Sequence, residues 1–106
     1  MQEYLKEMKR IFEVQEEELK SIRDIGEYFD ENVLEIKREQ SLGYDGWNTT
    51  YYTLVTGIGG PYVEFDTRYY INVYWDGKAL EMRTYDQEVR DQIDKIEEYL
   101  DELFEE

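Results

Sequence analysis

The sequence predicts an α+β fold, and three observations support this prediction. Residues 3–39 carry apolar side chains at a helical spacing, residues 49–84 are rich in β-branched and aromatic residues, and residues 85–104 return to helical periodicity. The chain has 106 residues, enough for one domain with one modest core. We therefore expect a single domain with a long N-terminal helix, an antiparallel sheet of three to four strands in meander order, and a C-terminal helix.

The N-terminal segment has the pattern of one long helix over residues 3–39. Its apolar residues alternate steps of three and four when Gln15 and Gly26 fill two gaps, which is the heptad pattern of helices that pair with each other. Such a helix would measure about 54 Å, whereas a domain of this size has a radius of gyration of about 13 Å. The projecting stripe would then join two copies as a homodimer, through a seam of Leu5, Met8, Phe12, Leu19 and Ile22.

Two other structures remain open for the same segment. An amphipathic helix could lie on a sheet and bury its apolar stripe in its own core. Alternatively, the helix could break near residues 21–26, where Ser21 and Asp24 have capping-box spacing and Gly26 is a poor helix former.

Residues 49–84 contain several strand patterns separated by turns. The turn-rich residues 41–48 end the helical periodicity, and strands are predicted at 49–56, 62–65, 68–75 and 78–83. Asp76-Gly77 predicts a type I′ hairpin turn, because both central positions need a positive φ. The glycines of residues 57–60 lie between two strands and precede a proline, so they predict a bulge or tight bend rather than a phosphate-binding loop.

The C-terminal segment predicts an amphipathic helix that is capped by Thr84, with Gln87 three residues later. Its apolar seam consists of Val89, Ile93, Ile96, Leu100 and Leu103. The opposite face carries an acidic row with one carboxylate per turn, about every 5.4 Å, which resembles the charge array of a phosphate backbone. The row consists of Asp91, Asp94, Glu98, Asp101 and Glu105. The alternative is that these carboxylates only keep the helix face soluble.

The formal net charge of −15 restricts the partners that the protein can bind. Such a surface repels nucleic acid and anionic membranes and attracts basic proteins. The sequence has no long apolar run and no apolar segment at its N-terminus, so we expect neither a membrane span nor a secretory signal, and a cytoplasmic location.

The amino-acid composition also restricts the chemistry. The chain has no Cys and no His, which excludes disulfides, thiolate or histidine nucleophile systems, and zinc sites with those ligands. Carboxylate chemistry with Mg²⁺ or Mn²⁺ stays open as a third hypothesis. Because the acidic residues show no metal-binding spacing, we expect no catalytic residues, no cofactor, no metal site and no enzymatic activity.

The strand segment is unusually aromatic. Since alternate side chains of a strand point to opposite faces, part of the aromatic set must face away from the core. In the strand 68–75 we expect Ile71, Val73 and Trp75 on one face and Tyr70, Asn72 and Tyr74 on the other. Tyrosines are enriched among the residues that dominate protein interfaces, so Tyr70 and Tyr74 are predicted to contact a partner.

Two resemblances follow from these features. A small, acidic chain without cysteine and with carboxylates in rows resembles the DNA-mimic inhibitors of phages and other mobile elements, the anti-CRISPR and anti-restriction proteins. The segments LVTGIGGPYVEF and VYWDGKALEM are similar to small uncharacterised proteins of phages and of archaeal or bacterial plasmids. The first resemblance implies an inhibitor, whereas the second implies no catalytic residues.

Together these observations favour a non-enzymatic inhibitor or modulator. Its acidic row would occupy the basic groove of a nucleic-acid-binding protein, and exposed tyrosines would anchor the complex. The alternative is a structural or adaptor protein that oligomerises through its heptad helix, with the charge serving solubility alone. Steep weakening of partner binding with salt would distinguish the first hypothesis from the second.

Overall fold

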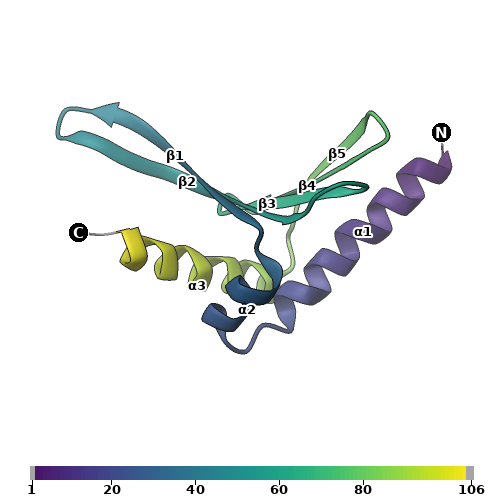
Figure 1. The fold of residues 1–106 in the computed structure, drawn as a ribbon, viewed down its shortest axis with the longest axis horizontal. Coiled ribbons are helices and arrows are strands. Elements are labelled where there is room, and N and C mark those ends of the chain that lie inside the picture. The colour runs from purple at the N-terminus through teal and green to yellow at the C-terminus, as the bar shows by residue number, and fades with distance from the viewer. Residues whose placement is uncertain (1, 105–106) are drawn as a thin grey trace.

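The structure, a computed structural model, describes residues 2–104 and is an α+β fold (Figure 1). The elements follow the chain in the order α1 (Gln2–Lys20), α2 (Ile25–Asn32), β1 (Glu35–Gly43), β2 (Gly46–Gly57), β3 (Tyr62–Asp66), β4 (Tyr70–Trp75), β5 (Lys78–Arg83) and α3 (Gln87–Phe104). The strands form one antiparallel sheet in the order β1-β2-β3-β4-β5. The predicted meander is thus confirmed, with five strands.

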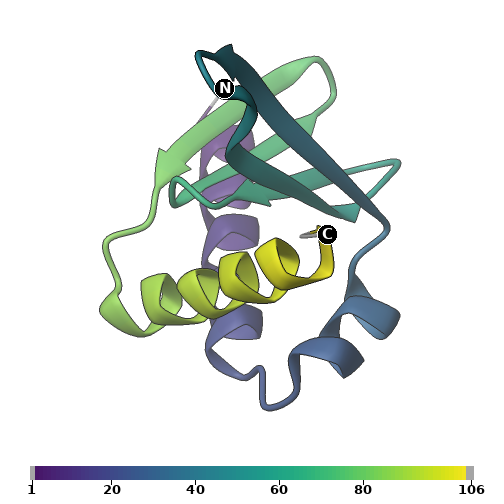
Figure 2. The same ribbon diagram turned by 90° about the vertical axis from the view of Figure 1, so that its left-hand side faces the viewer.

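The sheet and the helices form two layers. All three helices lie on one face of the sheet, and no helix covers the other face (Figures 1 and 2). The core between the layers contains Phe12, Leu19, Tyr28, Tyr52, Leu54, Phe65, Ile71, Val89, Ile93, Ile96 and Leu100. Within residues 2–104, none of the helices combines the length and the apolar character that a membrane crossing requires.

The prediction of one helix over residues 3–39 is wrong, and the break near residues 21–26 is what the structure contains. Helix α1 ends at Lys20, and the carboxylate of Asp24 caps α2 by accepting a hydrogen bond of 3.0 Å from the backbone N–H of Glu27. Residues 35–43 form a strand instead of a helix, with Ile36 opposite Leu54 in the register with β2. Ile36 fits both a helical and a strand period, so its position in the heptad pattern was a coincidence.

The predicted strands and turns agree closely with the structure. Asp76 and Gly77 both have positive φ values, 52° and 75°, as the hairpin between β4 and β5 requires. The register of β2 against β3 shifts between Val55 and Gly57, where the glycine-rich segment begins. Strand β2 starts earlier than the predicted strand 49–56: it begins at Gly46, so only Tyr44 and Asp45 separate it from β1.

Helix α3 is capped by Asp86 and not by the predicted Thr84. The Asp86 Oδ1 atom accepts hydrogen bonds from the backbone N–H groups of Glu88 at 2.9 Å and Val89 at 3.4 Å. Its other oxygen, Oδ2, lies 2.7 Å from the Nζ atom of Lys20 on α1. Thr84 is buried, and its hydroxyl donates instead to the Glu16 carboxylate at 2.6 Å. The cap therefore also ties α3 to α1.

Candidate protein-binding surface

The acidic row of α3 projects from a firmly anchored helix. Four of the five predicted seam residues, Val89, Ile93, Ile96 and Leu100, have no solvent exposure, whereas Leu103 is exposed. On the far side of the helix, Asp91, Asp94, Glu98 and Asp101 are all exposed. The fifth predicted member, Glu105, lies outside the described residues. The described part of the row thus faces solvent along more than two turns of α3.

Neutral donors hold three of these four carboxylates. The hydroxyl of Tyr69 donates to Asp94 at 2.7 Å, and the hydroxyl of Tyr52 donates to Asp101 at 2.8 Å. The side-chain amide of Gln87 donates to Asp91 at 2.9 Å, one turn away on the same helix. Because a tyrosine or glutamine donor carries no positive charge, each carboxylate is oriented without being neutralised.

The tyrosine partners remain protonated donors at neutral pH. The hydrogen bond to the Asp94 carboxylate, together with burial, raises the pKa of Tyr69 above its usual value of 10.0. Burial, followed by the hydrogen bond to Asp101, raises the pKa of Tyr52 in the same way. Both hydroxyls therefore remain available as donors to the row at neutral pH.

Tyr70 and Tyr74 lie on the sheet face that carries no helix, whereas α3 packs on the opposite face. Tyr74 is 40% exposed and lies edge-on against Tyr62, with ring centroids 5.6 Å apart. The guanidinium of Arg68 lies 3.8 Å from the ring centroid of Tyr51 and 5.3 Å from that of Tyr70. The predicted face division of β4 is confirmed, but the structure does not bring these tyrosines together with the acidic row.

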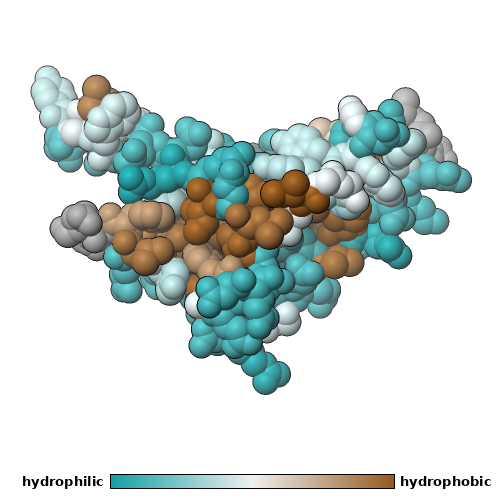
Figure 3. Space-filling model, in the orientation of Figure 1, coloured by the Kyte–Doolittle hydropathy of each residue, from teal (hydrophilic) through white to brown (hydrophobic). Residues whose placement is uncertain are grey.

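Other aromatic residues do lie at the same end of the molecule as the row. The ends of β1 and β2 form an arm of residues 39–50 that extends beyond the helices, at the end where α3 finishes (Figure 1). Every residue of the arm except Gly46 is exposed, including Leu42 at 68%, Trp47 at 66% and the fully exposed Tyr44. Figure 3 shows this arm standing clear of the helical layer. The sequence pattern does not reveal the arm, because residues 41–48 are typical of a turn that follows a helix.

A hollow joins the base of the arm to the C-terminal end of the row. It has a volume of about 380 Å³ and is lined by Arg38, Thr49, Tyr52, Asp101 and Phe104. The Phe104 ring stacks on Tyr52 at a centroid distance of 6.0 Å, and the Arg38 guanidinium lies 5.0 Å from the Phe104 centroid. The acidic row therefore ends beside the rings of Tyr52 and Phe104, at the base of the exposed arm.

The predicted oligomer seam belongs mostly to the core of its own chain. Met8, Phe12 and Leu19 are 3%, 7% and 0% exposed, and Ile22 packs against the core cluster. Leu5 is 46% exposed. A second copy could not reach the buried members of the seam without opening the core, so the heptad pattern reflects the packing of α1 on the sheet and on α3.

No family model matches the chain, and neither a curated protein nor a solved structure matches it.

Proposed function

We propose that this protein is a non-enzymatic modulator that binds the basic groove of a nucleic-acid-binding protein. The observation that carries the proposal is the set of uncharged donors, Tyr52, Tyr69 and Gln87, that orient the carboxylates of the acidic row without neutralising them. An inhibitor of the anti-CRISPR or anti-restriction type falls within this proposal, on the resemblance of composition described above.

The energetic reason concerns preorganisation. Flexible carboxylates lose side-chain freedom when they bind, which costs about 0.5–1.5 kcal/mol for each immobilised side chain. Asp91, Asp94 and Asp101 already have hydrogen-bond partners and lose less freedom than unpartnered side chains would. A partner that normally binds phosphates offers Lys and Arg side chains to such an array.

Charge alone favours fast association, but it gives little affinity at physiological salt. The exposed arm supplies the complementary element, because Trp and Tyr residues dominate the energetics of protein interfaces. Trp47 and Tyr44 lie near the tip of the arm, and the base of the arm borders the hollow beside Phe104. In this proposal the row directs the encounter and the arm slows dissociation.

The test is an affinity capture from a nuclease-treated bacterial lysate, at low and at high salt, with the immobilised protein as bait. The row variant carries Asp91→Asn, Asp94→Asn, Glu98→Gln and Asp101→Asn, which remove four charges and keep oxygen acceptors for Tyr52, Tyr69 and Gln87. We expect the wild type to retain a protein that a DNA duplex displaces from the bait, and the row variant to lose it.

A matched control removes the same number of charges from exposed positions elsewhere: Glu3→Gln, Glu13→Gln, Asp30→Asn and Glu35→Gln. If this control loses the partner as completely as the row variant does, binding follows net charge and the row has no special role. A retained partner that DNA does not displace would contradict the proposed groove.

A further inference from the structure

Strand β1 forms a free edge of the sheet. It stands at one end of the strand order and pairs with β2 alone. All of its residues are exposed except Ile36, which is partly covered. Alternate N–H and C=O groups of an antiparallel strand point away from its neighbour, and among residues 2–104 no other segment forms backbone hydrogen bonds along this side of β1. The edge is therefore able to pair with a further strand.

The devices that usually block such an edge are largely missing from β1. Edge strands are commonly short, interrupted by a bulge or a proline, or covered by another element. Strand β1 has nine residues and no proline, and the extra residue of its irregular pairing with β2 is Thr50 on β2, so β1 itself stays regular. The opposite edge strand, β5, has six residues and contacts α1. Charged side chains are the remaining protection of β1, so their order decides which strand can pair with it.

The charges of β1 are complementary to those of a second copy of the same strand. When two copies meet antiparallel about a twofold axis at Arg38, Lys37 of each copy lies opposite Glu39 of the other. Opposite charges at directly opposite positions stabilise an antiparallel sheet, and the symmetry forms this pair twice. All three of these residues are exposed in the single chain.

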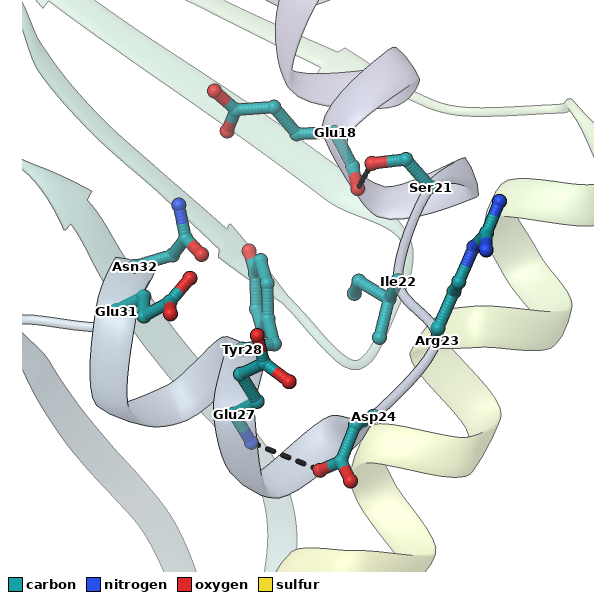
Figure 4. A pocket seen from close by; sticks show the side chains of 9 residues that line it. All are labelled: Glu18, Ser21, Ile22, Arg23, Asp24, Glu27, Tyr28, Glu31 and Asn32. Carbon is teal, nitrogen blue, oxygen red and sulfur yellow. Dashed lines mark hydrogen bonds between the residues drawn. The ribbon is translucent and has the colours of Figure 1, made fainter.

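The same register pairs two exposed leucines. Leu34 and Leu42 are 58% and 68% exposed, and they stand at equal distances along the chain from Arg38, so each lies opposite the other across the twofold axis. Leu34 comes just after α2, whose last residue, Asn32, is labelled in Figure 4. Covering these two side chains removes apolar surface from water. One register thus satisfies both the charges and the apolar side chains of the edge.

Neighbouring registers are disfavoured. An axis at Lys37 or at Glu39 would place each of these residues opposite its own copy, and like charges at such positions are destabilising. An axis at Arg38 leaves one like pair, the two Arg38 side chains. Each of these guanidinium groups already lies over Phe104 of its own chain, 5.0 Å from the ring centroid, and lines the hollow that also contains Asp101.

We propose that the protein forms a twofold homodimer through the edge of β1, with Lys37–Glu39 and Leu34–Leu42 pairs between the copies. Directly opposite side chains of paired strands point to the same face of the sheet. Both helical layers, and both acidic rows, then lie on one face of a continuous sheet. This interface is separate from the α1 seam, most of which is buried in the core, and it does not depend on the proposed function.

The test is the molecular mass in solution, measured by sedimentation equilibrium over a wide range of protein concentrations. The buffer contains enough salt to screen the repulsion between two chains of net charge −15. We expect the wild type to change from monomer to dimer as its concentration rises. Lys37→Glu and Glu39→Lys, each made alone, turn both charge pairs into repulsive ones. Each should raise the dissociation constant of the dimer by roughly tenfold.

An equimolar mixture of these two variants is the decisive arm of the experiment. The mixture restores opposite charges at both pairs, so heterodimers should form where neither variant dimerises by itself. The matched controls are Lys78→Glu and Glu81→Lys, at exposed positions of β5. They change the net charge by the same amounts and should alter the dissociation constant by less than about twofold.

A wild type that stays monomeric at every concentration overturns the inference. A dimer that Lys37→Glu leaves unchanged also overturns it, because another surface then joins the copies. A mixture that stays monomeric overturns the register. None of these measurements involves the acidic row or its partner, so their failure and the failure of the proposed function are separate outcomes.

Discussion

The hydroxyl of Tyr52, on β2, donates a hydrogen bond of 2.8 Å to the carboxylate of Asp101, on α3. Tyr52 is 2% exposed and belongs to the core, whereas Asp101 is an exposed member of the acidic row. One hydrogen bond thus connects the packing between sheet and helix to the surface that we propose to bind a partner. Tyr69 and Asp94 repeat this relationship two turns earlier on the helix.

Tyr52→Phe should separate these two roles. The variant keeps the ring in the core and removes the donor to Asp101, so we expect the free energy of unfolding to fall by about 1 kcal/mol, as measured by urea denaturation. Partner binding should weaken while its dependence on salt stays unchanged, because no charge is lost. A changed salt dependence would contradict the view that Tyr52 only orients the carboxylate.

Tyr28→Phe should alter the stability of the protein in alkaline solution. Burial raises the pKa of Tyr28 well above its usual value of 10.0. The stability associated with the protonated hydroxyl is complete below pH 10 and is lost as the pH rises toward the folded-state pKa, because the unfolded chain ionises first. Urea denaturation at increasing pH should show a smaller alkaline loss of stability in the variant than in the wild type. An equal alkaline loss in both proteins would show that other groups cause it.

Leu19→Ala should destabilise the isolated chain. Leu19 has no solvent exposure in the core, so the substitution should cost about 2–5 kcal/mol. Leu5→Ala, at a half-exposed position of the same helix, should stay within about 0.5 kcal/mol. Thermal unfolding at two widely separated protein concentrations is the measurement. A melting temperature that rises with concentration in Lys37→Glu, which blocks pairing through β1, would support the seam as an interface between copies.

Trp47→Ala should affect binding and leave the fold intact. The indole is 66% exposed at the end of the arm, so stability should change by less than about 0.5 kcal/mol. With the captured partner, we expect faster dissociation and a nearly unchanged association rate, because the arm carries no part of the acidic row. Thr50→Ala, in the same arm, is the control for a general disturbance of the hairpin. Equal dissociation rates for Trp47→Ala and the wild type would exclude the arm from the interface.

Much of the architecture follows from local patterns. The Asp-Gly turn, the alternation in β4 and the apolar seam of α3 depend on neighbouring residues, so periodicity and turn chemistry predict them well. The acidic row follows for the same reason, since helical spacing alone places its members on one face. The predicted hairpins and the C-terminal helix accordingly appear at nearly the expected positions.

Interactions between distant residues decide the remainder. Residues 35–43 pair with β2 although their spacing also suits a helix. The spacing of apolar residues could not predict this, because strand pairing is a contact between two segments of the chain and leaves no mark on the periodicity of either. Asp86, rather than Thr84, caps α3 in a site where Lys20 also lies, 66 positions away in the chain. The donors that orient the row, the exposed arm beside it and the buried hydroxyl of Tyr28 likewise arise only when the sheet packs on the helices. Composition therefore establishes the charge of this protein, and tertiary packing determines which of its carboxylates are held in place by hydrogen bonds.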